Sequence, residues 1–218
     1  MPPTPTAGTT PTGIAGQIDR LVELGLPALA GMTVEEFHAL ARDLPAEAPG
    51  AIVAVHPGLV PASALAPLLS RGDKSGFVVV DMADLDAFAP IDGLDAPEDA
   101  LYLINEVDRG DDMANWSPDE ALPEISSRGR RPLTIGEGIS WLLQEPERLA
   151  PNHCFMTIGS RKRRKGTALD SRTPAIWISG GTGRDGRDNR GAPKVGWCWA
   201  GNRHTWLGFA SAAAQPPA

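Results

Sequence analysis

Residues 51–80 read AIVAVHPGLVPASALAPLLSRGDKSGFVVV, with an apolar run at each end and a helical pattern between them. The runs at 51–55 and 77–80 are short and bounded by turn residues, which is typical of strands. Leucines recur on one side of a helix predicted over residues 61–70. The order of strand, helix and strand favours a parallel arrangement joined by a right-handed crossover.

The same pattern continues to a third strand at residues 101–105, after a shorter helix near residues 84–88. Towards the C-terminus the apolar runs at 154–158, 175–179 and 195–200 follow one another without a helix between them. Such a series favours antiparallel pairing. The expected fold class is therefore mixed α/β (α+β): a parallel strand–helix–strand N-terminal part, followed by antiparallel C-terminal strands in the same domain.

The length of 218 residues fits one domain. Residues 1–12 are rich in proline, threonine and glycine, so we expect a disordered tail there. Residues 13–210 form the predicted globular domain, and residues 211–218 a second disordered tail.

Helix starts are marked by local hydrogen-bonding patterns. A Ser or Thr followed three residues later by Glu forms a capping box, in which each side chain bonds the other residue's backbone N–H. The sequence contains three such pairs before apolar residues: Thr33 with Glu36, Ser117 with Glu120, and Thr134 with Glu137.

Charge is divided unevenly along the chain. Residues 1–127 hold 5 basic and 21 acidic residues, whereas residues 128–218 hold 15 basic and 6 acidic residues. Such asymmetry indicates either an anionic partner for the basic half or pairing of the two halves within one fold. We favour internal pairing, because a single domain brings both halves together.

Two cysteines, Cys154 and Cys198, are too few for a disulfide scaffold.

The N-terminus lacks the basic and apolar regions of a secretory signal, so a cytoplasmic location is expected. Residues 48–70 carry no formal charge but contain four prolines, which would leave backbone carbonyls unpaired in a bilayer. We therefore expect no membrane association.

Two motifs resemble phosphate-binding sequences, but the residues around each of them do not fit such a site. Residues 181–186 match the spacing G-x-G-x-x-G, but no apolar helix follows to hold a pyrophosphate, so a glycine- and arginine-rich loop is expected. Deleting residues 183–190 should then leave folding intact. The basic run at 161–165 has no interleaved aromatic residues for base stacking. We therefore do not expect nucleic acid as a partner, and a small anion is favoured over DNA.

The segment GWCWAGNRHTWLG at residues 196–208 is the densest in chemical groups. A turn after the strand could bring His204 back to Cys198, forming a nucleophile and its base with Asn202 orienting the imidazole. The alternative is a buried, inert thiol. His153 and Cys154 would complete a zinc set only with an unfavourable spacing, so no metal and no cofactor are predicted.

A ligand site is expected around the same segment. Strand alternation places Trp197 and Trp199 on one face, and aromatic walls with a few polar groups suit a concave pocket. The predicted lining comprises Trp197, Trp199, Trp206, Ser179, Gly180 and Gly181 beside His204. Asp108 and Arg109 follow the third strand, where ligands bind in open parallel sheets, and are added to this set. The alternatives are tryptophans buried in the core and a solvated turn at Asp108.

Several stretches resemble a known family. They include YLI at 102–104 before VDRG at 107–110, AIWISGG at 175–181, and GWCWAGN at 196–202 with HTWLG at 204–208. Across residues 14–210 the chain resembles an actinobacterial family filed as a domain of unknown function. It differs from that family's pattern at residues 182–191 and at the basic run. The resemblance implies no catalytic residues.

Three classes of function remain open. The first is a small-molecule binding protein or accessory enzyme of actinobacterial metabolism, with a ligand that could be anionic. The second is a Cys/His-dependent transferase or hydrolase using Cys198 and His204. The third is a module for protein interaction or self-assembly. The sequence leaves enzymatic activity and oligomeric state undecided.

Overall fold

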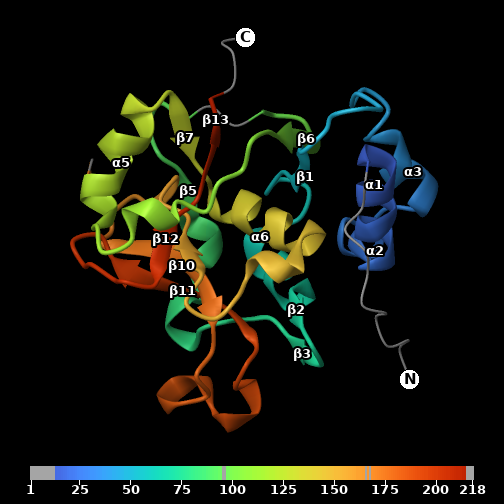
Figure 1. Ribbon diagram of the computed structural model, residues 1–218. Helices are drawn as coiled ribbons and strands as arrows, with labels where there is room; N and C mark the ends of the chain where they lie inside the picture. Colours follow the sequence, from blue (N-terminus) through green and yellow to red (C-terminus); the bar gives the residue numbers. More distant parts are fainter. Residues whose placement is uncertain (1–12, 95–96, 165, 167, 215–218) are drawn as a thin grey trace.

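The structure is a computed structural model that describes residues 13–94, 97–164, 166 and 168–214, and it has the expected mixed α/β composition (Figure 1). The α-helices are α1 (Ile14–Glu23), α2 (Leu26–Leu29), α3 (Val34–Ala39), α4 (Ala62–Leu65), α5 (Pro118–Ser127) and α6 (Ile135–Gln144). The strands are β1 (Ile52–Val55), β2 (Ser70–Arg71), β3 (Lys74–Ser75), β4 (Phe77–Val78), β5 (Phe88–Pro90), β6 (Leu101–Ile104), β7 (Arg130–Pro132), β8 (Cys154–Met156), β9 (Ser160–Lys162), β10 (Arg172–Ile178), β11 (Pro193–Trp199), β12 (Leu207–Phe209) and β13 (Ser211–Ala213).

The largest sheet has the order β12-β8-β10-β11-β4. Its centre is the antiparallel pair of β10 and β11, and β8 adds antiparallel to β10. The predicted antiparallel pairing of the C-terminal strands is therefore confirmed. The outer strands β12 and β4 both add in parallel, to β8 and β11 respectively.

Helix α6 lies at the centre of the molecule (Figure 1), and all ten of its residues are buried. A helix that is buried on every side must pack against several elements. The Trp141 ring contacts the Phe155 ring of β8 at 5.1 Å between centroids, and Ser140 Oγ accepts a hydrogen bond from Val55 N–H of β1 at 3.1 Å. Helix α6 thus joins β1 to the large sheet.

The expected parallel crossovers of the N-terminal part are wrong. β1 and β6 form their own antiparallel pair, with Ile52 opposite Ile104, and β4 joins the large sheet instead. The Gln17 side chain of α1 donates to Ala51 C=O, just before β1, and accepts from Val53 N–H of β1, each at 2.8 Å. A side-chain amide therefore satisfies backbone groups of β1 that a further strand would otherwise bond.

The three capping boxes are confirmed at the starts of α3, α5 and α6. In α6 the cap is also an ion pair, because the fully buried Glu137 receives two hydrogen bonds from Arg131, at 2.7 and 3.0 Å. The helix predicted over residues 61–70 is shorter: α4 passes into a 3₁₀ turn, Ala66–Leu68, which contains a proline. The helix near residues 84–88 is a single 3₁₀ turn, Leu85–Ala87.

The C-terminal boundary predicted at residue 210 is too early. Ser211–Ala213 forms β13, which pairs antiparallel with β7. The tail predicted at residues 1–12 and the last part of the second tail, residues 215–218, lie outside the described residues. No helix in the described part of the chain is long and apolar enough to cross a membrane.

Ion pairs connect the acidic and the basic halves of the chain. Asp84 accepts hydrogen bonds from both Lys162 and Arg172 at 2.6 Å. Further pairs of this kind are Arg161 with Asp119 at 3.9 Å, Arg163 with Asp92, and Arg203 with Glu120. The basic run at 161–164 is thus largely paired within the fold, and Lys165 lies outside the described residues.

Candidate functional site

The tryptophans predicted to share one site form two separate pairs. Trp197 and Trp199 lie on the same face of β11, with ring centroids 4.5 Å apart, and the Trp199 residue is 45% exposed. Trp206 instead contacts Trp177 at 6.3 Å and His204 at 5.5 Å. None of these tryptophans lines either of the two pockets described below.

Cys198 and His204 do not form a hydrogen-bonded pair among the described residues. Burial raises the pKa of the Cys198 thiol to about 11 and lowers the pKa of His204. The Nε2 atom of His204 is buried without a partner in the described part of the chain. The backbone N–H of Asn202 donates to Trp199 C=O at 3.0 Å, and no described hydrogen bond joins its side chain to His204. This geometry fits a thiol in the core better than an activated nucleophile.

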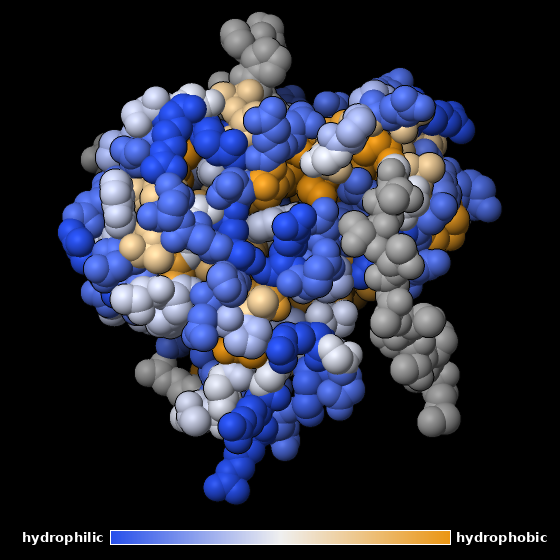
Figure 2. All heavy atoms as spheres, in the orientation of Figure 1, coloured by the Kyte–Doolittle hydropathy of each residue, from blue (hydrophilic) through white to orange (hydrophobic). Residues whose placement is uncertain are grey.

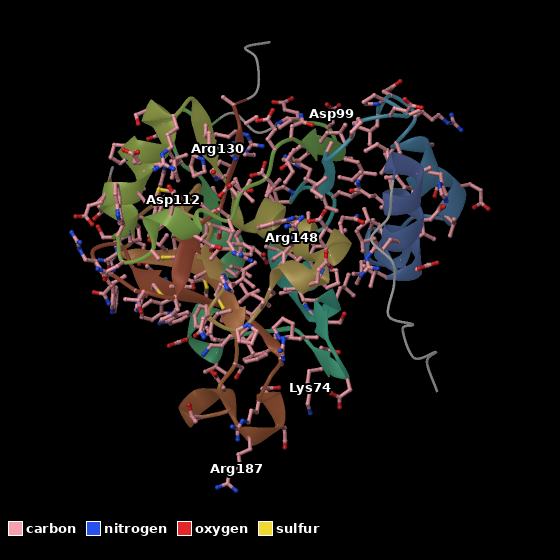
Figure 3. The ribbon with its side chains drawn as sticks, in the orientation of Figure 1. Lys74, Asp99, Asp112, Arg130, Arg148 and Arg187 are labelled. Atoms are coloured by element: carbon pink, nitrogen blue, oxygen red, sulfur yellow. The ribbon has the colours of Figure 1, made fainter. Side chains whose placement is uncertain are left out.

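The turn at Ser179, Gly180 and Gly181 is hydrogen-bonded to the arginine-rich loop, residues 182–191. Ser179 Oγ accepts a hydrogen bond from Gly181 N–H at 3.1 Å and donates to Asp185 at 2.8 Å. Asp185 in turn pairs with Lys194 of β11 at 2.6 Å. The loop that follows contains two 3₁₀ turns, Gly183–Asp185 and Arg187–Asn189, instead of a phosphate-binding helix. It projects from the body of the molecule, with Arg187 at its far end (Figures 1 and 3).

Asp108 and Arg109 line a pocket of about 350 Å³. The other lining residues are Val107, Asp111, Asp112, Trp141 and Arg148. Figure 3 labels Asp112 and Arg148, which come from the segment after β6 and the segment after α6. The same face is hollowed near its middle, with hydrophobic residues along the upper edge of the hollow and hydrophilic residues around much of the rest (Figure 2). We call this cavity the Arg109 pocket.

Arg109 is fixed by its neighbours. Its Nε and Nη2 atoms donate to the two oxygens of Asp111 at 2.8 and 2.6 Å, and Nη1 donates to Arg148 C=O at 2.8 Å. The ion pair raises the pKa of Arg109 and lowers the pKa of Asp111. His153 Nδ1 lies 3.3 Å from both side chains. This network ties the segment after β6 to the segments after α6 and before β8.

Other charged groups of the pocket are only partly satisfied. Arg148 donates through Nε to Glu145 at 2.7 Å, and no hydrogen bond of its two Nη atoms occurs among the described residues. Asp108 accepts from Gly110 N–H at 2.6 Å through Oδ1, and Asp112 accepts from Arg128 at 2.7 Å through Oδ2. Within the described residues, the second oxygen of each carboxylate has no bonding partner.

Backbone conformations of low population surround this pocket. In the described part of the chain, the non-glycine residues with positive φ are Glu106 (51°), Asn115 (70°) and Asn152 (62°). Glu106 and Asn115 flank the pocket segment, and Asn152 precedes His153. Asn adopts positive φ more readily than other non-glycine residues, so Glu106 is the uncommon case, and such conformations cluster at functional sites.

The sequence interpretation included Asp108 and Arg109 but missed Trp141 and Arg148. Trp141 belongs to an apolar helix pattern, and Arg148 follows a proline turn far along the chain, so neither carries a local sign of a site. No group of three or more His, Cys, Asp or Glu residues arranged to hold a metal ion occurs in the part of the chain that the structure describes.

A second pocket, of about 270 Å³, lies beside α1 and α3. Most of its lining is apolar, and its two polar residues, Asp19 and His38, face each other at 3.8 Å. The Arg109 pocket offers more directional contacts and is the better candidate for a functional site.

Comparison with known proteins identifies a family but no individual relative. No curated protein and no solved structure matches the chain. A family described as a family of unknown function (DUF5701) matches residues 20–218. The match covers most of the chain, which therefore belongs to the DUF5701 family.

Proposed function

We propose that this protein binds a small polar molecule in the Arg109 pocket. The observation that carries the proposal is the constrained framework of the pocket: Arg109 bonds two other segments, and the non-glycine residues of positive φ described above stand beside them. A framework fixed before binding lowers the ordering cost of binding. The volume of about 350 Å³ lies at the small end of ligand pockets and suits a metabolite.

The proposed ligand site lies in the Arg109 pocket and not at the tryptophan segment, residues 196–208. The class of function is the expected one, a protein that binds a small molecule. Trp197, Trp199 and Trp206, which were predicted to line the ligand site, do not line this pocket, and the proposal does not need Cys198. The origin in actinobacteria, the cytoplasmic location and a role in metabolism stay predictions.

A thermal-shift screen with small polar metabolites tests the proposal. A ligand at one hundred times its Kd stabilises the folded state by about 2.7 kcal/mol, which corresponds to about 5–10 °C for a chain of this size. The variant Val107→Trp places a large ring at the pocket wall and should abolish the shift. Val80→Trp is the matched control, because Val80 is 73% exposed and does not line the pocket. A shift that survives in Val107→Trp would contradict the proposal.

A further inference from the structure

The charges of the Arg109 pocket are not all neutralised within it. Arg109 and Asp111 satisfy each other, with both carboxylate oxygens bonded to the guanidinium. Asp112 pairs with Arg128 and Arg148 pairs with Glu145, each at 2.7 Å and each with a residue outside the pocket lining, whereas Asp108 has no ion pair among the described residues. The pocket therefore presents one cationic and two anionic side chains that do not bond one another.

The free atoms of these groups suit a ligand that carries both a negative and a positive charge. The two Nη groups of Arg148 form a planar donor fork, which matches the two oxygens of a carboxylate. Its Nε atom is held by Glu145 Oε2, which also accepts a hydrogen bond from Trp141 Nε1 at 3.1 Å. Arg148 is thus anchored at Nε while its outer edge stays available.

The aspartates suit a cation. Asp108 is anchored through Oδ1 and has its Oδ2 unbonded, and Asp112 likewise keeps one oxygen unbonded among the described residues. Carboxylate oxygens accept hydrogen bonds and attract an ammonium group. A purely anionic ligand would meet Asp108, which has no ion pair among the described residues, without bringing a group to pair with it, which costs affinity.

We propose that the ligand is a small zwitterion of the amino-acid class, with its carboxylate at Arg148 and its ammonium group at Asp108 and Asp112. The inference rests on the proposed function and names the ligand class for the same pocket. It differs from the anionic ligand that the sequence analysis left open. Trp141 and Val107 supply apolar wall for the remainder of the ligand.

The test compares three matched ligands on the full chain by isothermal titration calorimetry. For each free amino acid of a standard panel, the partners are its carboxamide, which keeps only the cation, and its deaminated acid, which keeps only the anion. A hydrogen bond to a charged group supports at least a tenfold difference in affinity. We expect at least one free amino acid to bind at least ten times more tightly than either partner compound.

Variants assign the two ends. Arg148→Gln and Asp108→Asn should each weaken binding of the zwitterion at least tenfold. Arg187→Gln and Asp188→Asn make the same charge changes on exposed residues of the arginine-rich loop and should leave binding unchanged. Circular dichroism spectra and melting temperatures matching the wild type would show that the pocket variants are folded.

The outcomes separate the two proposals. If an anion or a cation alone binds as well as the zwitterion, and Val107→Trp abolishes that binding, the inference is overturned and the proposed function stands. The same conclusion follows if a metabolite other than an amino acid binds in the pocket while the whole panel does not. If neither the panel nor the metabolite screen gives a ligand that depends on Val107, both proposals fail.

Discussion

The Cys198 side chain belongs to the hydrophobic core, on the face of β11 opposite Trp197 and Trp199. Its neighbours in the sequence alternate around it as a strand requires, so the sequence correctly predicted which tryptophans share a face. The same sequence could not fix the depth of the thiol, because burial depends on elements that pack on β11 from elsewhere. Burial favours the neutral thiol over the thiolate, which is the reactive form.

We expect the native Cys198 thiol to react slowly with iodoacetamide. With a pKa of about 11, about 0.1% of it is thiolate at pH 8, against about 24% for an ordinary cysteine of pKa 8.5. The expected rate in a Cys154→Ser background is therefore at least 100-fold lower in the native chain than in the urea-unfolded chain. Mass spectrometry of timed samples measures both rates. Native reaction as fast as unfolded reaction at pH 8 would restore the nucleophile hypothesis.

Local sequence patterns correctly predicted where helices begin, but they did not predict which strand pairs with β1. A capping box involves residues three apart, so Thr134 and Glu137 could be assigned from the sequence alone. The apolar run of β1 indicates a strand, but its partner depends on chain segments far away. The antiparallel pairing of β10 with β11 was predictable, because one loop connects them.

The arginine-rich loop was expected to be unnecessary for folding, but its contacts argue against this expectation. Asp185, inside the segment proposed for deletion, bonds Lys194 Nζ through both oxygens at 2.6 and 2.8 Å. The two side chains are 10% and 14% exposed. Deleting residues 183–190 would leave a largely buried ammonium group without its partner, which the composition of the loop does not reveal.

Asp185→Ala should therefore lower the free energy of unfolding by about 2–4 kcal/mol, because Lys194 loses its counter-charge in a mostly buried position. Urea unfolding followed by circular dichroism measures the loss. Asp188→Ala is the control, since this exposed carboxylate of the same loop should change stability by less than about 0.5 kcal/mol. The double variant Asp185→Ala with Lys194→Met should regain part of the loss. Equal effects of Asp185→Ala and Asp188→Ala would contradict this account.

The Arg109 pocket could be predicted only in part from the sequence, because it is formed by segments that are far apart in the chain. Asp108 and Arg109 were selected because ligands bind beyond parallel strands, yet the strand before them is antiparallel to β1. Their pocket arises because Arg109 reaches the segment after α6 and the residue before β8. Contacts between segments so far apart follow from the packing of α6, which no local pattern encodes.

The charge asymmetry was interpreted correctly as internal pairing, and it makes the fold sensitive to acid. Hydrogen bonds from Arg172, and then from Lys162, hold the pKa of Asp84 well below its ordinary range. Arg172 lowers the pKa of Asp170 in the same way, and Arg109 lowers that of Asp111. A carboxylate whose pKa is lower in the folded than in the unfolded chain contributes stability above its unfolded pKa, near 3.9. That contribution is lost as the pH falls towards the folded value.

The variant Asp84→Asn isolates this contribution. At pH 7 we expect it to unfold about 1–2 kcal/mol more easily than the wild type, because the two basic partners lose a carboxylate that is 31% exposed. The difference should shrink steadily between about pH 5 and pH 2, because Asp84 of the unfolded wild-type chain takes up a proton in this range while the folded chain still resists protonation. Asp73→Asn changes an exposed carboxylate with no ion pair among the described residues and should give almost no difference at any pH. Urea midpoints at each pH provide the comparison. A difference for Asp84→Asn that stays constant down to pH 2 would show that its loss of stability does not come from ionic pairing between the two halves of the chain.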